Sequence, residues 1–170
     1  SKNRDRVVSK LHKGIEHLFK THGVDHLIGR GTVTGPHSVR VEGHGEVTAR
    51  NIVLATGSVP AELPFLKRDG KLVLNSDDAL KLETVPERLL VVGAGAIGLE
   101  MGLIYRYLGS KVTVVEIMPQ VVPGSETELA DILAGELKKQ GLTLHLGTTL
   151  TDPVVDAEKG EVRVSLKTGD

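Results

Sequence analysis

The chain has 170 residues and a formal net charge of −1 at pH 7; 39% of its residues are hydrophobic and 25% are charged. This balance is typical of a globular protein and gives no indication of a nucleic-acid partner or a membrane surface. The sequence contains no cysteine, which excludes a disulfide, a thiolate nucleophile and a cysteine-based metal site within these residues. No apolar run reaches the roughly 20 residues of a membrane span.

The first third of the chain predicts a helix followed by strands. Apolar side chains recur on one face of residues 5–20, which is typical of an amphipathic helix. Alternating apolar residues between turn signals then predict a meander with strands at 24–33, 38–42 and 46–49. The apolar run 52–58, which ends in small residues, predicts a buried strand.

An irregular connection is predicted next, over residues 60–81, because it contains two prolines and an Asp-Gly pair. The segment Ser76-Asp77-Asp78 predicts a capped short helix that ends at Leu82. The histidines of the first third, at 12, 17, 22 and 26, fit neither one helix face nor a zinc pattern. We therefore predict surface histidines and no metal site.

The most informative stretch is a buried apolar strand, a glycine-rich turn and a helix that begins after Gly95. Gly93, Gly95 and Gly98 form the pattern G-x-G-x-x-G of dinucleotide-binding proteins. The first glycine allows a tight turn, the second lets a pyrophosphate approach the backbone, and the third lets the helix pack closely on the strand. The first N–H groups of the helix then face the phosphates.

A second buried strand, 111–116, follows this helix and ends in Glu116, which is 18 residues beyond Gly98. The expected spacing of the ribose-binding acid is roughly 20 residues. A carboxylate there accepts hydrogen bonds from both ribose hydroxyls and repels a 2′-phosphate. The sequence therefore predicts a site that prefers NAD to NADP.

The remaining elements continue this unit. Gly109 is predicted to end the first helix, and Ser125 to cap a second helix that ends before Gly141. Residues 142–146 predict a third parallel strand. Val154-Val155 and 162–166 predict the start of a second meander.

Two motifs carry a resemblance to a known family. At Ala55-Thr56-Gly57-Ser58-x-Pro60 and at Gly93 to Glu100, the sequence resembles the pyridine nucleotide-disulfide oxidoreductases, and within them most closely the dihydrolipoamide dehydrogenase branch, the E3 component of 2-oxo-acid dehydrogenase complexes. The segments 6–16 and 139–142 are similar as well. The resemblance matches only the middle of the family's sequence. Since the chain starts at Ser1 without Met and stops at a predicted turn, we expect both ends to be cut from a longer sequence.

The resemblance implies a fold and a domain order. The fold is an α/β, FAD/NAD(P)-binding Rossmann-like three-layer fold with β-meanders and two partial lobes. Residues 1–80 are expected to form a partial FAD-binding domain. Residues 81–170 are expected to form an NAD-binding domain, truncated before its last strand.

The resemblance also assigns roles to single residues. It implies FAD contacts at Gly31, Thr56, Gly57 and Ser58, and NAD contacts along the loop Gly93, Ala94, Gly95, Ala96, Ile97, Gly98, Leu99 and Glu100. Glu100 is expected near the nicotinamide and flavin rings, Glu116 at the ribose and Leu150 at the adenine. Ala96 stands where glutathione reductases carry Tyr, and this difference favours the dihydrolipoamide branch. No catalytic residue is expected in this segment.

The implied activity is electron transfer from dihydrolipoamide to a disulfide, then to FAD and finally to NAD⁺. The family's redox cysteine pair, its first glycine-rich motif and its C-terminal His-Glu pair are not in these residues. The expected partners are the lipoyl domains of 2-oxo-acid dehydrogenase complexes and a second copy in a homodimer, in the cytoplasm or, in a eukaryote, the mitochondrial matrix. Two alternatives stay open: a non-catalytic nucleotide-binding module, and a segment of a mercuric reductase or NADH oxidase.

Overall fold

A computed structural model describes residues 2–169 of the chain. The chain divides into two compact units, Ser1–Ser58 and Val59–Asp170, and each is described here by itself. The division falls after Ser58, and the predicted boundary at residue 80 lies inside the second unit. In the described residues no helix combines the length and the apolar character needed to cross a membrane.

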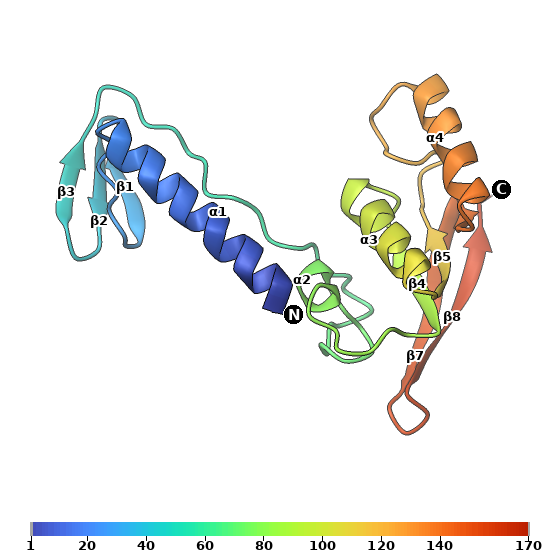
Figure 1. The fold of residues 1–170 in the computed structure, drawn as a ribbon. Helices are drawn as coiled ribbons and strands as arrows, with labels where there is room; N and C mark the ends of the chain where they lie inside the picture. The colour runs from blue at the N-terminus through green and yellow to red at the C-terminus, as the bar shows by residue number, and fades with distance from the viewer. Residues whose placement is uncertain (1, 170) are drawn as a thin grey trace. The chain divides into compact units, whose positions relative to one another are not determined.

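The first unit contains one long helix and a small antiparallel sheet (Figure 1). Its elements are α1 (Lys2–Thr21), β1 (Gly31–Gly35), β2 (Ser38–Val41) and β3 (Gly45–Thr48). The central strand pairs Val39 with Val33 on one side and with Val47 on the other, so the predicted helix and meander are confirmed. No described residue of this unit is buried, since the sheet is short and the apolar face of α1 is exposed.

Two strand predictions in this unit are wrong. Residues 24–30 lie outside any strand, and the first strand begins only at Gly31. Residues 52–58 form no strand at all, and Val53 and Leu54 are 84% and 73% exposed. An apolar run becomes a strand only where a neighbouring strand accepts its hydrogen bonds, and no described residue offers such a partner here.

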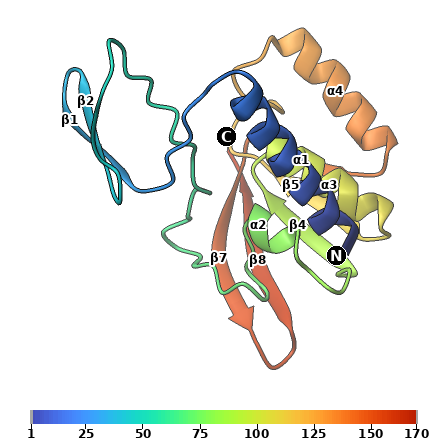
Figure 2. The ribbon, with the colours of Figure 1, turned by 60° about the vertical axis from the view of Figure 1, so that its left-hand side comes forward.

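The second unit holds a parallel sheet with order β4-β5-β6, a helical layer and an antiparallel hairpin. Figure 1 shows α3 on one side of the sheet and the hairpin on the other, and Figure 2 shows the same layers from a second direction. This arrangement confirms the predicted Rossmann-like fold and its parallel strands. The elements are α2 (Ser76–Ala79), β4 (Arg88–Val92), α3 (Ala96–Tyr107), β5 (Lys111–Val115), α4 (Thr127–Lys139), β6 (Thr143–His145), β7 (Thr148–Asp156) and β8 (Glu161–Thr168).

The core lies between the two longer helices and the sheet. It is built from aliphatic side chains and one tyrosine, among them Leu99, Tyr105, Val112, Val114, Leu137 and Leu142. Both helices end as predicted, because Gly109 and Gly141 have φ angles of +107° and +92°, which favour glycine. The predicted cap of α4 is wrong. Glu126 occupies that position, while the Ser125 hydroxyl donates to the carbonyl of Val122.

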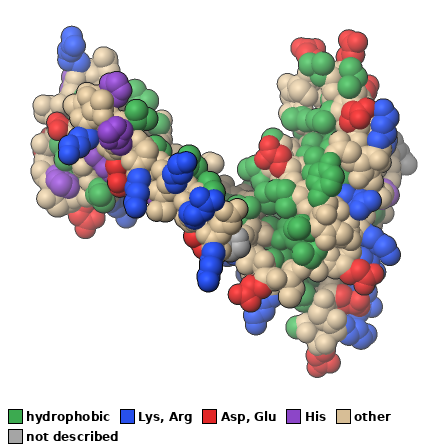
Figure 3. Space-filling model, viewed as in Figure 1, with side chains coloured by type: hydrophobic (Ala, Val, Ile, Leu, Met, Phe, Trp, Pro, Cys, Tyr) green, Lys and Arg blue, Asp and Glu red, His purple; other side chains and the backbone are tan. Residues whose placement is uncertain are grey.

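The strand β4 is less buried than its apolar sequence predicts. Its residues alternate between half-buried and exposed, and Leu90 and Val92 are 36% and 45% exposed. Further apolar side chains are exposed on α3, including Ile97 and Ile104. Figure 3 shows apolar side chains gathered on this unit. A fully apolar strand needs cover on both faces, and the described residues cover β4 on one.

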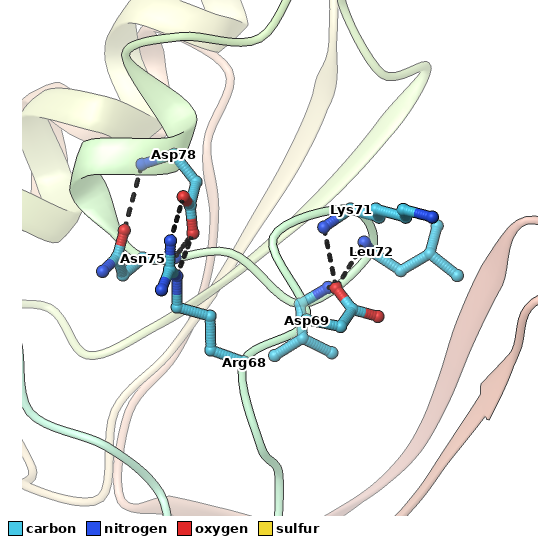
Figure 4. Close-up of polar contacts among 7 residues, drawn as sticks. Arg68, Asp69, Lys71, Leu72, Asn75 and Asp78 are labelled. Carbon is cyan, nitrogen blue, oxygen red and sulfur yellow. Dashed lines mark hydrogen bonds and ion pairs between the residues drawn. The ribbon is translucent and has the colours of Figure 1, made fainter.

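The connection before β4 is held by short-range polar contacts (Figure 4). Asn75, one residue before the segment predicted to cap α2, is the N-cap: its side chain accepts from the Asp78 N–H, and the Asp78 carboxylate accepts from the Asn75 N–H. Arg68 donates two hydrogen bonds to Asp78, at 2.5 and 2.6 Å. The Tyr105 hydroxyl donates to the carbonyl of Ala79 at 2.5 Å and thereby ties α2 to α3. Burial raises the pKa of Tyr105 above its ordinary value of 10.0, so the hydroxyl keeps its proton further into the alkaline range.

The Arg68–Asp78 pair predicts an acid-dependent step. The guanidinium of Arg68, helped by the Asn75 N–H, lowers the pKa of Asp78 from 3.8 to about 2. The stability that the ionised Asp78 carboxylate contributes is therefore present above pH 3.8 and is lost as the pH falls through 2. The side-chain carboxyl shift of Asp78 in an NMR titration is expected to show this midpoint.

The variant R68M should move that midpoint towards 3.8, because it removes the largest cause of the shift. R88M serves as the control, since Arg88 pairs with Glu161 and not with Asp78. An unchanged midpoint in R68M would contradict the assignment.

Candidate nucleotide-binding site

The glycine-rich turn has the geometry that its sequence predicts. Gly93 has a φ angle of +102°, and its N–H donates to the carbonyl of Val115 at 2.8 Å. At Gly98 a Cβ atom would overlap the carbonyl oxygen of Gly93 and stand 3.2 Å from the side chain of Val91. The roles predicted for these two glycines in the turn and in the close packing of helix and strand are thus confirmed.

The start of α3 presents free backbone donors at the surface. Gly95 is the N-cap residue, with a φ angle of −73°, and nothing lies within 4 Å of the position that a Cβ atom would take. The N–H groups of the first three helical residues, Ala96, Ile97 and Gly98, have no acceptor within the helix. Ala96 and Ile97 are exposed. This surface suits a pyrophosphate, which needs an open backbone and donors at a helix N-terminus.

Glu116 lies directly beside this turn, one residue after β5 ends. Its side chain is buried, and its two carboxylate oxygens accept from different backbone groups: Oε2 from the Ala94 N–H and Oε1 from the Met118 N–H, both at 2.8 Å. Each oxygen keeps a second lone pair. The carboxylate is therefore fixed next to the glycine-rich turn and retains capacity to accept from a ribose hydroxyl.

The connection between β5 and α4 also contacts the turn, which the sequence did not predict. The Val122 N–H donates to the carbonyl of Ala94 at 2.8 Å. The same connection is also joined to the residue before β7, because the Gly147 N–H donates to the carbonyl of Met118 at 2.9 Å. Both contacts join backbone groups. Backbone donors and acceptors are the same at every residue except proline, so no side-chain pattern in the sequence marks these contacts.

The other predicted nucleotide contacts differ in exposure. Ala94 and Leu99 are buried, at 0% and 5% exposure, and belong to the core. Glu100 is exposed on the surface of α3. Leu150 is 6% exposed and lies in β7 opposite Leu166. Their contacts with a nucleotide stay predictions.

Three histidines of the first third can be examined as possible metal ligands. His12 and His17 lie in α1, and the ring of His26 meets that of Phe19 edge-on, with centroids 5.3 Å apart. Across residues 2–169 no three side chains of metal-binding type gather into one group. The described part of the chain thus shows no assembled metal site.

The family model described as pyridine nucleotide-disulphide oxidoreductase matches residues 1–170. The chain belongs to this family. The resemblance inferred from the two glycine-containing motifs is confirmed.

Two similar curated relatives of this oxidoreductase chain have names that denote a dihydrolipoyl or dihydrolipoamide dehydrogenase. Dihydrolipoamide dehydrogenase of Chaetomium thermophilum is 45% identical over 152 residues, which are 86% of this chain and 30% of the relative. Dihydrolipoyl dehydrogenase 3 of Pseudomonas putida is 42% identical over 161 residues, which are 92% of this chain and 34% of the relative. The chain therefore spans about a third of the length of these relatives.

Solved structures are similar to this chain in fold. LpdA from Mycobacterium tuberculosis superposes with a TM-score of 0.78 and 26% identity over 97% of this chain and 38% of its own. The HOCl-induced flavoprotein disulfide reductase RclA from Escherichia coli superposes with a TM-score of 0.70 and 26% identity over 89% of this chain and 35% of its own. Both support the Rossmann-like architecture of this oxidoreductase chain.

The residues matched to the flavin motifs form no such assembled site in the described residues. Gly31 lies in β1, where a Cβ atom would meet the side chain of Val39 at an ordinary 3.6 Å. Thr56, Gly57 and Ser58 are exposed and irregular, although the φ angle of +79° at Gly57 does favour glycine. In the described residues no hydrogen bond joins these three to Gly31. Their contacts with FAD stay predictions.

Proposed function

We propose that this chain is the NAD-binding part, with a portion of the FAD-binding part, of a dihydrolipoyl dehydrogenase. The observation that carries the proposal is the position of Glu116, whose buried carboxylate contacts the glycine-rich turn through the Ala94 N–H. The family match and the dihydrolipoyl dehydrogenase names of the relatives support the same activity. The chain is proposed to bind NAD⁺ in preference to NADP⁺.

Each part of the site has a separate task in this proposal. The N–H groups at the start of α3 bind the pyrophosphate, and the bare backbone at Gly95 lets it come close. Glu116 accepts hydrogen bonds from the adenosine ribose and repels a 2′-phosphate. The contact between Gly98 and Gly93 keeps the helix start aimed at the phosphates. When bound, NAD⁺ supplies the hydride acceptor, while the protein binds and orients it.

The activity of the whole protein is proposed from the relatives. Electrons pass from dihydrolipoamide to a disulfide, then to FAD, then to NAD⁺. Residues 1–80 contribute to the FAD-binding domain through Gly31 and Thr56–Ser58, and residues 81–170 to the NAD-binding domain. Lipoyl domains and a second copy of the protein are the proposed partners. The proposed location is the cytoplasm or the mitochondrial matrix.

Two measurements on the purified full-length protein test the proposal. Calorimetric titration with NAD⁺ and NADP⁺ is expected to show an affinity for NAD⁺ at least about tenfold higher, because a 2′-phosphate beside Glu116 is repelled. Dihydrolipoamide is then expected to drive NAD⁺ reduction. Binding of NAD⁺ without this turnover would favour a related flavoenzyme or a non-catalytic nucleotide-binding module. Failure to bind NAD⁺ would contradict the proposal as a whole.

A further inference from the structure

Val122 belongs to the connection between β5 and α4, which Figure 1 shows. It has a backbone conformation that valine rarely adopts. Its φ angle is +45°, within the left-handed region, although its side chain is β-branched. Pro123 follows, and a residue before proline favours an extended conformation. Such strained residues persist only where their surroundings fix them, and they cluster at functional sites.

The surroundings of Val122 do fix it. Its carbonyl accepts from the Ser125 N–H at 3.1 Å and from the Ser125 hydroxyl at 2.8 Å. Gln120 closes the same loop by donating to the carbonyl of Ser125 at 3.0 Å. The Val122 side chain packs against the core, and the preceding Val121 is fully buried within it. The strained conformation is therefore built into the fold of this connection.

In this conformation the backbone N–H of Val122 donates to the glycine-rich turn. The Val122 N–H donates to the carbonyl of Ala94, while the Ala94 N–H donates to Glu116, so Ala94 is held through both of its backbone polar groups. Glycine would adopt the same φ angle without strain, but it would leave the connection more flexible. Valine at this position thus strains the backbone locally, but it makes the contact with the turn more rigid than glycine would.

We propose that Val122 is a positioning residue for the pyrophosphate: its rigid, left-handed backbone holds the carbonyl of Ala94 and with it the turn from Gly93 to Gly98. This inference rests on the proposed function, because it assigns the turn to nucleotide binding. Val122 itself does not touch the nucleotide. It acts by keeping the turn ordered before binding, which lowers the entropy lost when the nucleotide binds.

The variant V122G in the purified full-length protein tests the proposal. Restoring the freedom of one backbone residue is expected to weaken NAD⁺ binding about tenfold. The KM for NAD⁺ should rise similarly, with kcat and the KM for dihydrolipoamide unchanged. Hydrogen exchange in the unliganded protein should accelerate in peptides covering 90–99 and 117–125. The thermal midpoint should change little, because relief of strain offsets the loss of packing.

The chain offers matched controls. Asp152 is the other described non-glycine residue with a positive φ angle, +51°, and it lies in the β7–β8 hairpin. D152G is therefore expected to leave NAD⁺ binding unchanged. V122I keeps the β-branched side chain and should bind NAD⁺ as the unmodified protein does. Should V122G fail to fold, V122N takes its place. Asparagine adopts this conformation readily but lacks the apolar packing that fixes Val122 against the core, so V122N should also loosen the connection and weaken NAD⁺ binding.

The outcomes separate the two proposals. Weaker NAD⁺ binding with faster exchange at both peptides, in V122G and not in D152G or V122I, supports the positioning role. Unchanged binding in V122G or V122N, with or without faster exchange, overturns it while leaving the proposed function intact. No NAD⁺ binding by the unmodified protein overturns the proposed function, and the positioning role with it.

Discussion

The variant G98A is expected to destabilise the protein by about 2 kcal/mol and to abolish measurable NAD⁺ binding. Alanine favours a helix over glycine by about 1 kcal/mol, so propensity alone predicts a gain. A Cβ atom at Gly98 would, however, overlap the backbone carbonyl of Gly93, which no side-chain rotation can relieve. Overpacking of this kind costs about 1–3 kcal/mol and sometimes more. The helix must then shift away from the turn.

Gly95 provides the matched control for G98A. Nothing lies within 4 Å of a Cβ atom there, so G95A should cost less than about 1 kcal/mol, the usual effect at an N-cap. Its NAD⁺ affinity should still fall about tenfold or more, because the new methyl group stands where the pyrophosphate approaches. Urea unfolding and calorimetric titration of both variants measure the two effects. A G98A protein as stable as the unmodified one, or a G95A protein with unchanged affinity, would contradict this division of roles.

The fold of the parallel unit was predictable because its glycines and its apolar residues are both local signals in the sequence. Its strands and helices carry periodic apolar residues, and Gly93, Gly109 and Gly141 punctuate them at positions that need a positive φ angle. Each local signal agrees with the tertiary contact that it serves. The parallel strands and the close contact at Gly98 therefore followed from local patterns.

The same reasoning failed where a local pattern depends on a distant partner. Residues 24–30 and 52–58 have strand-like composition, yet the described residues provide no neighbouring strand for their hydrogen bonds. Composition predicts that a segment fits a sheet but not that a sheet is present to receive it. The predicted helix caps were wrong by one residue for the same kind of reason. Several neighbouring polar residues can occupy one cap position, and Asn75 caps α2 where the sequence indicated residues 76–78.

In the candidate site the sequence located the residues but not their contacts. The spacing from Gly98 placed Glu116 correctly at the strand end. That its carboxylate accepts from Ala94 and Met118, and that Val122 completes the contact, depends on backbone groups that have no sequence signature. Glu116 consequently has a structural role in addition to the predicted ribose contact.

These two roles predict that E116A lowers both the stability and the cofactor selectivity. Ala94 is fully buried, so its N–H loses its acceptor at a cost of about 1–3 kcal/mol. Met118 is 48% exposed, so its N–H can donate to water instead, and the loss of this hydrogen bond should add little to the destabilisation. Removal of the negative charge should also lower the NAD⁺/NADP⁺ affinity ratio about tenfold, because a 2′-phosphate is no longer repelled.

The variant E116Q separates the structural role from the selectivity. Its amide oxygen can still accept from the Ala94 N–H, so the loss of stability should be smaller than in E116A, but the lost charge should lower the affinity ratio to a similar extent. E128Q removes a charge from the first turn of α4 and should change neither quantity. Thermal unfolding gives the stabilities, and titration with both nucleotides gives the ratios. If both variants at Glu116 lower stability but keep the ratio, the carboxylate serves only to hold the turn, and the preference for NAD⁺ must come from another part of the protein.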